Sequence, residues 1–252
     1  MRTTWWAAVL AALLPMPLAA QSLVQRVRDA GDGTVRMSFA SRAGVCSRGP
    51  GSITILDHTD EDEEWEGGCE PGPVRVSLRV RAGRVTAAET YVGGRWRPGR
   101  ARVTDLGLVP AQQAADLLLE LAPRVAEDDG GELVTAATLA DSVVVWPKLL
   151  RMARDTRIRE ETRRQAVFWL GQAAGEAATR GLDSLATDAG GEVEIRKHAV
   201  FALSQRPNEE GVPVLIRIAR TNRHPEIRKT ALFWLGQSDD PRALTLFEEI
   251  LR

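Results

Sequence analysis

The chain has 252 residues, 44% of them hydrophobic, which suffices for one or two domains with a sizeable core. Its formal net charge of −1 gives no electrostatic case for nucleic acid or an anionic membrane surface, so we predict neither as a partner. All 33 basic residues except Lys148, Lys197 and Lys229 are arginine, which indicates a GC-rich bacterial genome. Arginine used for phosphate binding is the alternative.

Residues 1–20 have the composition of a secretory signal peptide. Arg2 supplies a short positive region, the apolar stretch runs from Trp5 to Leu18, and Leu18-Ala19-Ala20 resembles a cleavage site. The apolar stretch is too short for a permanent transmembrane helix. We therefore expect cleavage after Ala20, a periplasmic or secreted protein, and no stable membrane insertion afterwards. An uncleaved anchor is the alternative.

Residues 21–103 are predicted to form a small β domain. The segments 34–39 and 74–80 alternate between apolar and polar residues, as half-buried strands do. A tight turn at 81–84 leads from the second segment into 85–92, so these two form a hairpin. Residues 52–56 are a further candidate strand, and a short helix over 23–28 precedes the sheet. Residues 93–103, rich in Gly, Arg and Pro, are expected to be a linker.

The two cysteines, Cys46 and Cys69, are expected to form one disulfide, because the protein is predicted to be exported. In the chain-entropy description this bond stabilises the fold by about 3 kcal/mol. Free thiols and a metal site are the alternatives. No CxxC motif or nearby pair of histidines supports a metal site.

From residue 104 onward the hydrophobic period is helical. Pro110 opens a helix over 111–122, and the segments 133–140 and 143–153 follow. The ten residues Arg163–Gln172 then recur as Arg196–Gln205 and Arg228–Gln237, at steps of 33 and 32 residues. Self-similarity at this period predicts a solenoid of stacked helical pairs, closed by an unpaired final helix over 244–251.

The repeated segment resembles the HEAT-repeat family, in its bacterial phycobilisome-lyase-like form. That family's pattern is an apolar residue, Arg, two variable positions, Ala, a small residue and then Leu-Gly. Ile195-Arg196 with 199–203 fits it, and so does Ile227-Arg228 with 231–236. The resemblance covers residues 110–252 and is strongest from 159 onward. It implies an α-solenoid, and it carries no catalytic motif that transfers to this chain.

Each repeat carries a cation, a phenylalanine and a glutamine at i, i+4 and i+8. At about 100° per residue, with Ile195 at zero, the core face centres near about 50° and Phe201 falls near about 240°, almost opposite. Stacked side by side, these triads are predicted to form a row of cations, a row of phenylalanines and a row of glutamines on a concave partner-binding surface. The triads are Arg164, Phe168, Gln172; Lys197, Phe201, Gln205; and Lys229, Phe233, Gln237. The alternative is that the phenylalanines pack on one another or under the β domain. Trp169 and Trp234 are assigned to inter-repeat packing, with a groove-edge role as the alternative.

Arg163, Arg196 and Arg228 also recur. In the HEAT family this arginine forms a structural ladder tied to acidic turn residues, here residues such as Asp188 or Glu192. We expect a structural role for all three.

No nucleophile, phosphate-binding or dinucleotide-binding motif is present in the sequence. The acidic segment 57–64 lacks the glycine and the spacing of a calcium loop, so we expect a solvated loop, with a weak cation site as the alternative. We accordingly predict no catalytic residues, no metal and no cofactor.

These observations predict an α+β chain of two domains, a disulfide-stapled β domain at 21–103 and a HEAT-type α-solenoid at 104–252. The expected function is that of an exported, non-enzymatic scaffold that holds a peptide or protein of the bacterial envelope. One alternative is an enzyme or enzyme accessory, either a lyase-like member or a site in the β domain. Another is an envelope sensor anchored by its N-terminal segment.

Overall fold

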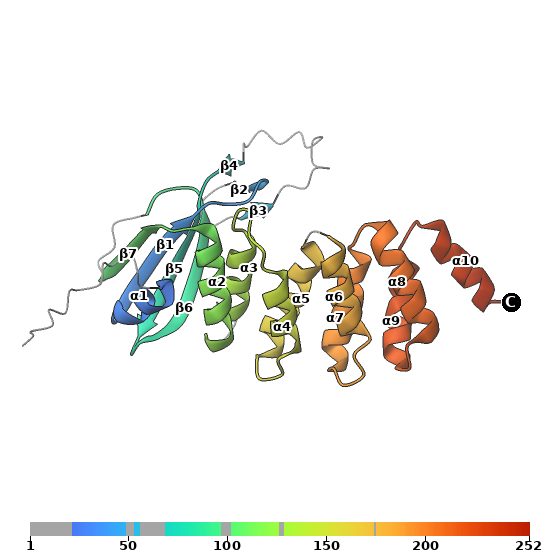
Figure 1. Cartoon of the computed structure of the whole chain (residues 1–252). Coiled ribbons are helices and arrows are strands. Elements are labelled where there is room, and N and C mark those ends of the chain that lie inside the picture. The colour runs from blue at the N-terminus through green and yellow to red at the C-terminus, as the bar shows by residue number, and fades with distance from the viewer. Residues whose placement is uncertain (1–21, 49–52, 56–68, 97–101, 126–128, 174) are drawn as a thin grey trace, which may run out of the picture.

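The computed structural model describes residues 22–48, 53–55, 69–96, 102–125, 129–173 and 175–252. An N-terminal region built on β-strands is followed by a row of paired helices that runs to the C-terminal end (Figure 1). This is the α+β arrangement that the sequence predicts. The predicted signal peptide, residues 1–20, and the acidic segment, residues 57–64, lie outside the described residues.

A four-stranded sheet forms the centre of the N-terminal region. Its strands are β1 (Gly33–Phe39), β5 (Val74–Arg81), β6 (Arg84–Val92) and β7 (Val103–Leu108), in the order β6-β5-β1-β7. Strands β1 and β6 both pair antiparallel with β5. Strands β5 and β6 form the predicted hairpin, and both turn residues, Ala82 and Gly83, have positive φ.

Strand β7 is absent from the sequence-based prediction. It pairs in parallel with β1, with Thr34 opposite Val103 and Arg36 opposite Asp105. The Arg36 Nε donates to Asp105 Oδ2 at 2.8 Å, which ties the two strands together on the polar face. The sheet therefore continues to Leu108, beyond residue 103, where the sequence-based β domain ends. Of the expected linker, residues 97–101 lie outside the described residues.

One face of this sheet is buried. The alternation of β1 places Val35, Met37 and Phe39 in the core, and the apolar residues of β5 and β6 join them there. Helix α3 (Asp129–Thr138) packs against β6. Helix α1 (Leu23–Asp29), which the sequence predicts almost to the residue, packs against α2 (Ala111–Leu121). Burial on one face explains why these strands alternate so regularly.

A second, smaller sheet has the order β3-β2-β4, with β3 (Thr54–Ile55), β2 (Val45–Ser47) and β4 (Glu70–Pro71). The sequence predicts a strand at 52–56, and β3 is its described part. A disulfide joins Cys46 of β2 to Cys69, directly before β4, with a Cα–Cα distance of 5.4 Å. The predicted disulfide thus joins the central strand β2 to the start of the edge strand β4.

The helical array forms two layers. Its inner layer consists of α3, α5, α7 and α9, each packed against the next, and α4, α6, α8 and α10 form the outer layer in the same way. Helix α2 is the outer partner of α3, and α10 ends the described array without an inner partner after it, as predicted for the final helix. After α2, a 3-10 turn η3 (Ala122–Arg124) precedes α3, and the later helices are α4 (Trp146–Arg154), α5 (Glu160–Gln172), α6 (Glu176–Ala186), α7 (Val193–Ser204), α8 (Asn208–Thr221), α9 (Pro225–Leu235) and α10 (Pro241–Ile250).

Small residues set the close spacing of the inner layer. A Cβ placed on Gly171 of α5 would lie 3.0 Å from the Cβ of Ala202 on α7, so a larger residue at either position would push the two helices apart. The core-facing Ala166 and Ala199 are fully buried in the same layer. The alanines and the glycine of the repeated segment therefore serve close helix packing.

The sheet and the array share one hydrophobic core. The backbone also joins them: the Arg42 N–H donates to the Leu139 carbonyl at 2.8 Å, and the Asp141 N–H donates to that of Ala40 at 2.9 Å. The segment that follows β1 and the segment that follows α3 each supply one donor and one acceptor. The start of the inner layer is thus held against the sheet, and the rest of the array extends away from it (Figure 1).

A candidate binding surface on the inner helices

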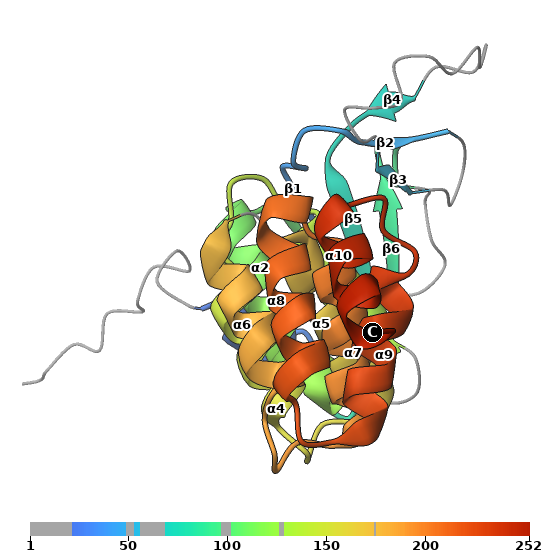
Figure 2. The same cartoon turned by 90° about the vertical axis from the view of Figure 1, so that its right-hand side faces the viewer.

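The three triads lie side by side on the inner layer, whose helices α5, α7 and α9 form one side of the array in Figure 2. Gln205 and Gln237 follow the ends of α7 and α9 by one and two residues, and the other seven residues lie within the helices. The buried residues of these helices, such as Ala166, Ala199 and Ala231, face the core. All three glutamines are exposed, and the cations are half-buried or exposed. We call the surface formed by these nine residues the triad face: Arg164, Phe168, Gln172, Lys197, Phe201, Gln205, Lys229, Phe233 and Gln237.

The phenylalanines differ in exposure, and the neighbouring helix explains the difference. Phe168 is 40% exposed and Phe233 58%, whereas Phe201 is half-buried. The ring of Trp234, on the next inner helix, lies 4.8 Å from that of Phe201. In α7 the position equivalent to Trp234 is Ala202, which leaves Phe168 without such a cover. Phe233 lies on the last inner helix that the structure describes.

Each cation of the triad face has an acidic residue three positions before it in the same helix. Arg164 pairs with Glu161, and Lys197 Nζ lies 3.2 Å from a carboxylate oxygen of Glu194. The position three residues before Lys229 is occupied by another glutamate of the first helical turn. The row of cations is thus accompanied by a row of glutamates: Glu161, Glu194 and Glu226.

The glutamine end of the triad face borders a small cavity. Gln205 and Gln237 line it together with Trp234, and its volume is about 300 Å³. The rest of the lining is mixed: polar residues such as Ser204, Asn208 and Asp239 alternate with the aliphatic Leu203, Val212 and Leu215. The aromatic row therefore borders a hollow of mixed polarity next to the second and third glutamines.

The family model of HEAT repeats matches residues 189–252, which span α7 to α10 and two of the three triads. Residues 189–252 are HEAT repeats. No curated protein matches the chain. The preceding pairs of helices continue the same two layers toward the sheet.

The repeated arginines, Arg163, Arg196 and Arg228, each bind a turn between two helices of the array. Arg163, 4% exposed, donates to Glu192 Oε2 at 2.6 Å, as the sequence predicts. Arg196 donates to Asn222 Oδ1 at 3.1 Å, and Arg228 donates to the backbone carbonyl of Asn222 at 2.8 Å. Arg163 and Arg196 reach the turn before the next inner helix, whereas Arg228 reaches the turn before its own helix, α9. In the second turn an asparagine replaces the acidic residue that we expected.

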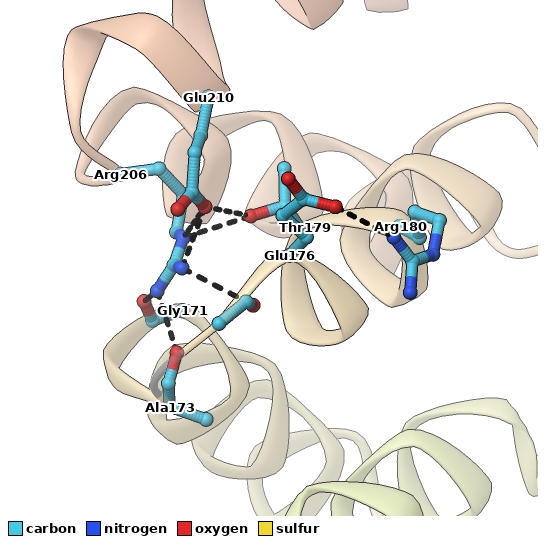
Figure 3. Close-up of polar contacts among 8 residues, drawn as sticks. Gly171, Ala173, Glu176, Thr179, Arg180, Arg206 and Glu210 are labelled. Atoms are coloured by element: carbon cyan, nitrogen blue, oxygen red, sulfur yellow. Dashed lines mark hydrogen bonds and ion pairs between the residues drawn. The ribbon is translucent and has the colours of Figure 1, made fainter.

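A third buried arginine, Arg206, joins three helices and was not predicted from the sequence. Its guanidinium donates to the carbonyls of Gly171 and Ala173, at 3.0 and 2.6 Å, at the end of α5. It also donates to Thr179 Oγ1 of α6 at 3.0 Å and to Glu210 Oε2 of α8 at 2.7 Å, as Figure 3 shows. The spacing of Arg206 and Glu210, four residues apart, is the one local signal that could have indicated part of this cluster.

Arg206 also bears on the triad face. Gln172 lies between the two residues whose carbonyls Arg206 binds, and Gln205 directly precedes Arg206 in the chain. One guanidinium therefore fixes the backbone on which two of the three glutamines stand. Glu210, which accepts from Thr179 and from Arg206, has its pKa lowered by these hydrogen bonds.

The remaining aromatic and histidine side chains agree with structural roles. The Trp169 Nε1 donates to Thr135 Oγ1 of α3 at 3.1 Å, and the indole is buried between the two helices, as predicted for inter-repeat packing. His198 is half-buried on α7, and burial, with a smaller contribution from the Arg164 cation, lowers its pKa.

A larger hollow of about 690 Å³ lies on the outer layer between α8 and α10. Ile216 and Leu246 line it together with three arginines. Each arginine is already paired with a carboxylate: Arg217 with Asp183, Arg220 with Glu249, and Arg242 with Asp240. This neutralisation gives the outer hollow no excess positive charge for an anionic ligand.

Among the described residues, no group of three or more His, Cys, Asp and Glu side chains is arranged so that it could hold a metal ion. Within that same part of the chain, every helix is too short or too polar to cross a membrane. The triad face remains the strongest candidate for a functional surface.

Proposed function

We propose that this chain is an exported, non-enzymatic scaffold that holds a peptide or protein of the bacterial envelope on its triad face. The observation that carries the proposal is the exposure of Phe168 and Phe233, at 40% and 58%, on a row that repeats from helix to helix. Large aromatic side chains that are exposed together on one face are typical of an interaction surface. HEAT-type arrays use such extended surfaces to bind other proteins.

The form of the surface supports binding rather than catalysis. Phenylalanine rings supply apolar area, the glutamine amides supply donors and acceptors, and the paired charges make the rim soluble. The predicted signal peptide and the disulfide between Cys46 and Cys69 support export, because disulfides persist in oxidising compartments. An enzyme or enzyme accessory, such as a lyase-like HEAT protein, is the competing proposal.

The test is a comparative pull-down from an envelope extract. The bait is the mature chain from Gln21, compared with the triple variant Phe168→Ala, Phe201→Ala and Phe233→Ala. The matched control carries Leu244→Ala. Leu244 is a large apolar side chain that is 63% exposed, like the phenylalanines, but it lies on the outer helix α10. Circular dichroism and urea denaturation check that each bait is folded.

We expect a partner that the wild type and the Leu244→Ala control capture and that the folded triple variant loses. If the triple variant captures the same proteins as the wild type, the triad face is not the binding surface. If the triple variant unfolds, the phenylalanines contribute to the stability of the fold. The single variants of the exposed Phe168 and Phe233 then show whether these two residues also bind the partner.

A further inference from the structure

The apolar part of the triad face is one ring wide. In each triad the cation and the glutamine stand four residues before and after the phenylalanine, which is about 6 Å along the axis of a helix on either side. The apolar row is thus a narrow strip between a charged row and an amide row. A helical ligand presents an apolar stripe more than about 100° wide and needs a broader groove than this.

The strip has a period set by the helix packing. Neighbouring packed helices lie about 8–10 Å apart. The Trp234 ring lies 4.8 Å from Phe201 and 5.1 Å from Phe233, so the two phenylalanine rings are at most 9.9 Å apart, the sum of these distances. Because α5 packs against α7 and α7 against α9, equivalent positions on these helices recur at about 8–10 Å, and the bound for Phe201 and Phe233 is compatible with that spacing.

A polyproline II segment has this repeat. It has three residues per turn and a rise of about 3.1 Å, so every third residue returns to the same side after about 9.3 Å. In a β-strand, residues on one side recur after about 6.6 Å, which is shorter than the spacing of about 8–10 Å between packed helices. The polyproline II backbone also has no internal hydrogen bonds, so its carbonyls are free to accept from the amides of Gln172, Gln205 and Gln237.

The charge of the triad face selects against charged ligands. Each of the three cations is accompanied by a glutamate three positions earlier: Glu161, Glu194 and Glu226. The Arg164–Glu161 and Lys197–Glu194 pairs are closed in the structure. A face on which the charges balance in this way complements an uncharged segment, and an acidic or basic peptide would have to break these pairs.

We propose that the triad face binds an uncharged, proline-rich segment in the polyproline II conformation. The segment crosses α5, α7 and α9 and places every third residue on a phenylalanine. Phe168, which is 40% exposed, receives one such residue, and the Phe201–Trp234–Phe233 cluster receives the next. Aromatic rings are the usual platform for such segments, because proline is flat, apolar and pre-ordered. This inference rests on the proposed function and specifies its partner.

The experiment measures the fluorescence anisotropy of a labelled peptide of repeated Pro-Pro-Leu units with the full mature chain. A second peptide has the same composition with its leucines placed together, and a third is an uncharged amphipathic helical peptide. Single variants Phe168→Ala and Phe233→Ala replace exposed rings, and Leu244→Ala is the control.

We expect the Pro-Pro-Leu peptide to bind more tightly than the other two. Each phenylalanine variant should weaken it by roughly tenfold, whereas the control should leave it unchanged. Binding should change little between low and high salt, because no charge pairing contributes. Equal binding of the periodic and rearranged peptides, tighter binding of the helical peptide, or a strong salt dependence would overturn the proposal.

The two proposals fail in different ways. If the pull-down loses a partner with the triple variant but the Pro-Pro-Leu peptide does not bind, the triad face is a binding surface for another kind of segment. If neither assay responds to the phenylalanines, both proposals are wrong.

Discussion

Replacing Arg206 with alanine should destabilise the whole chain, because this side chain closes a buried cluster between three helices. Arg206 is 8% exposed, and its guanidinium donates to Thr179, to Glu210 and to the carbonyls of Gly171 and Ala173. The variant Arg206→Ala would leave the Glu210 carboxylate and two carbonyls without their donor. Removing one partner of a buried ion pair costs about 3–5 kcal/mol. Glu210 keeps some contact with water, so we expect about 3 kcal/mol.

The structure supplies a matched control for burial. Arg180 and Glu176 of α6 have the same four-residue spacing as Arg206 and Glu210, and their contact of 3.1 Å appears in Figure 3. Their side chains are 70% and 80% exposed. An exposed pair of this kind contributes less than about 1 kcal/mol, so Arg180→Ala should leave the free energy of unfolding almost unchanged.

Urea denaturation followed by circular dichroism measures both variants against the wild type. The variant Arg206→Lys adds a test of geometry, because an ammonium group keeps the charge but cannot reproduce the planar fork that reaches several acceptors. We expect its stability to fall between those of the wild type and Arg206→Ala. If Arg206→Ala and Arg180→Ala destabilise the chain equally, burial of the cluster does not have the effect that we assign to it.

Two further predictions concern the disulfide and pH. Reducing the bond between Cys46 and Cys69 should lower the free energy of unfolding by about 3 kcal/mol, which denaturation with and without dithiothreitol would measure; equal curves would contradict a stabilising role. Burial and the Arg164 cation lower the pKa of His198 below its ordinary value of 6.5, so the unfolded chain binds the proton more readily. Stability should therefore fall as the pH drops through 6.5, and His198→Gln should reduce that dependence. An NMR titration giving a pKa at or above 6.5 would contradict the shift.

The repeated segment made the helical array predictable from the sequence. The position of each core-facing alanine follows from a local 3.6-residue period, and the period repeats three times, so errors at one copy are corrected by the others. The same phase placed Phe168 and Phe233 away from the core, and the structure confirms this exposure. The binding of a partner there stays a prediction.

Long-range contacts were not predictable in the same way. Strand β7 is short, contains a glycine and pairs in parallel with β1, which lies more than sixty residues earlier in the chain. Nothing within the strand itself reveals that partner, because parallel pairing depends on the path of the intervening chain. Arg206 is similar, since most of its acceptors are backbone carbonyls of distant turns, which any residue could provide.

The half-burial of Phe201 shows how one substitution between repeats changes the surface. Trp234 covers Phe201, whereas the equivalent Ala202 leaves Phe168 uncovered, and Ala202 cannot be larger because it lies against Gly171. The close packing of α5 on α7 therefore keeps a small residue at position 202, and Phe168 stays 40% exposed. The variant Gly171→Val would widen that packing and should both destabilise the array by about 1–3 kcal/mol and alter the shape of the triad face. In this array the packing of the core and the form of the candidate binding surface are set by the same small residues.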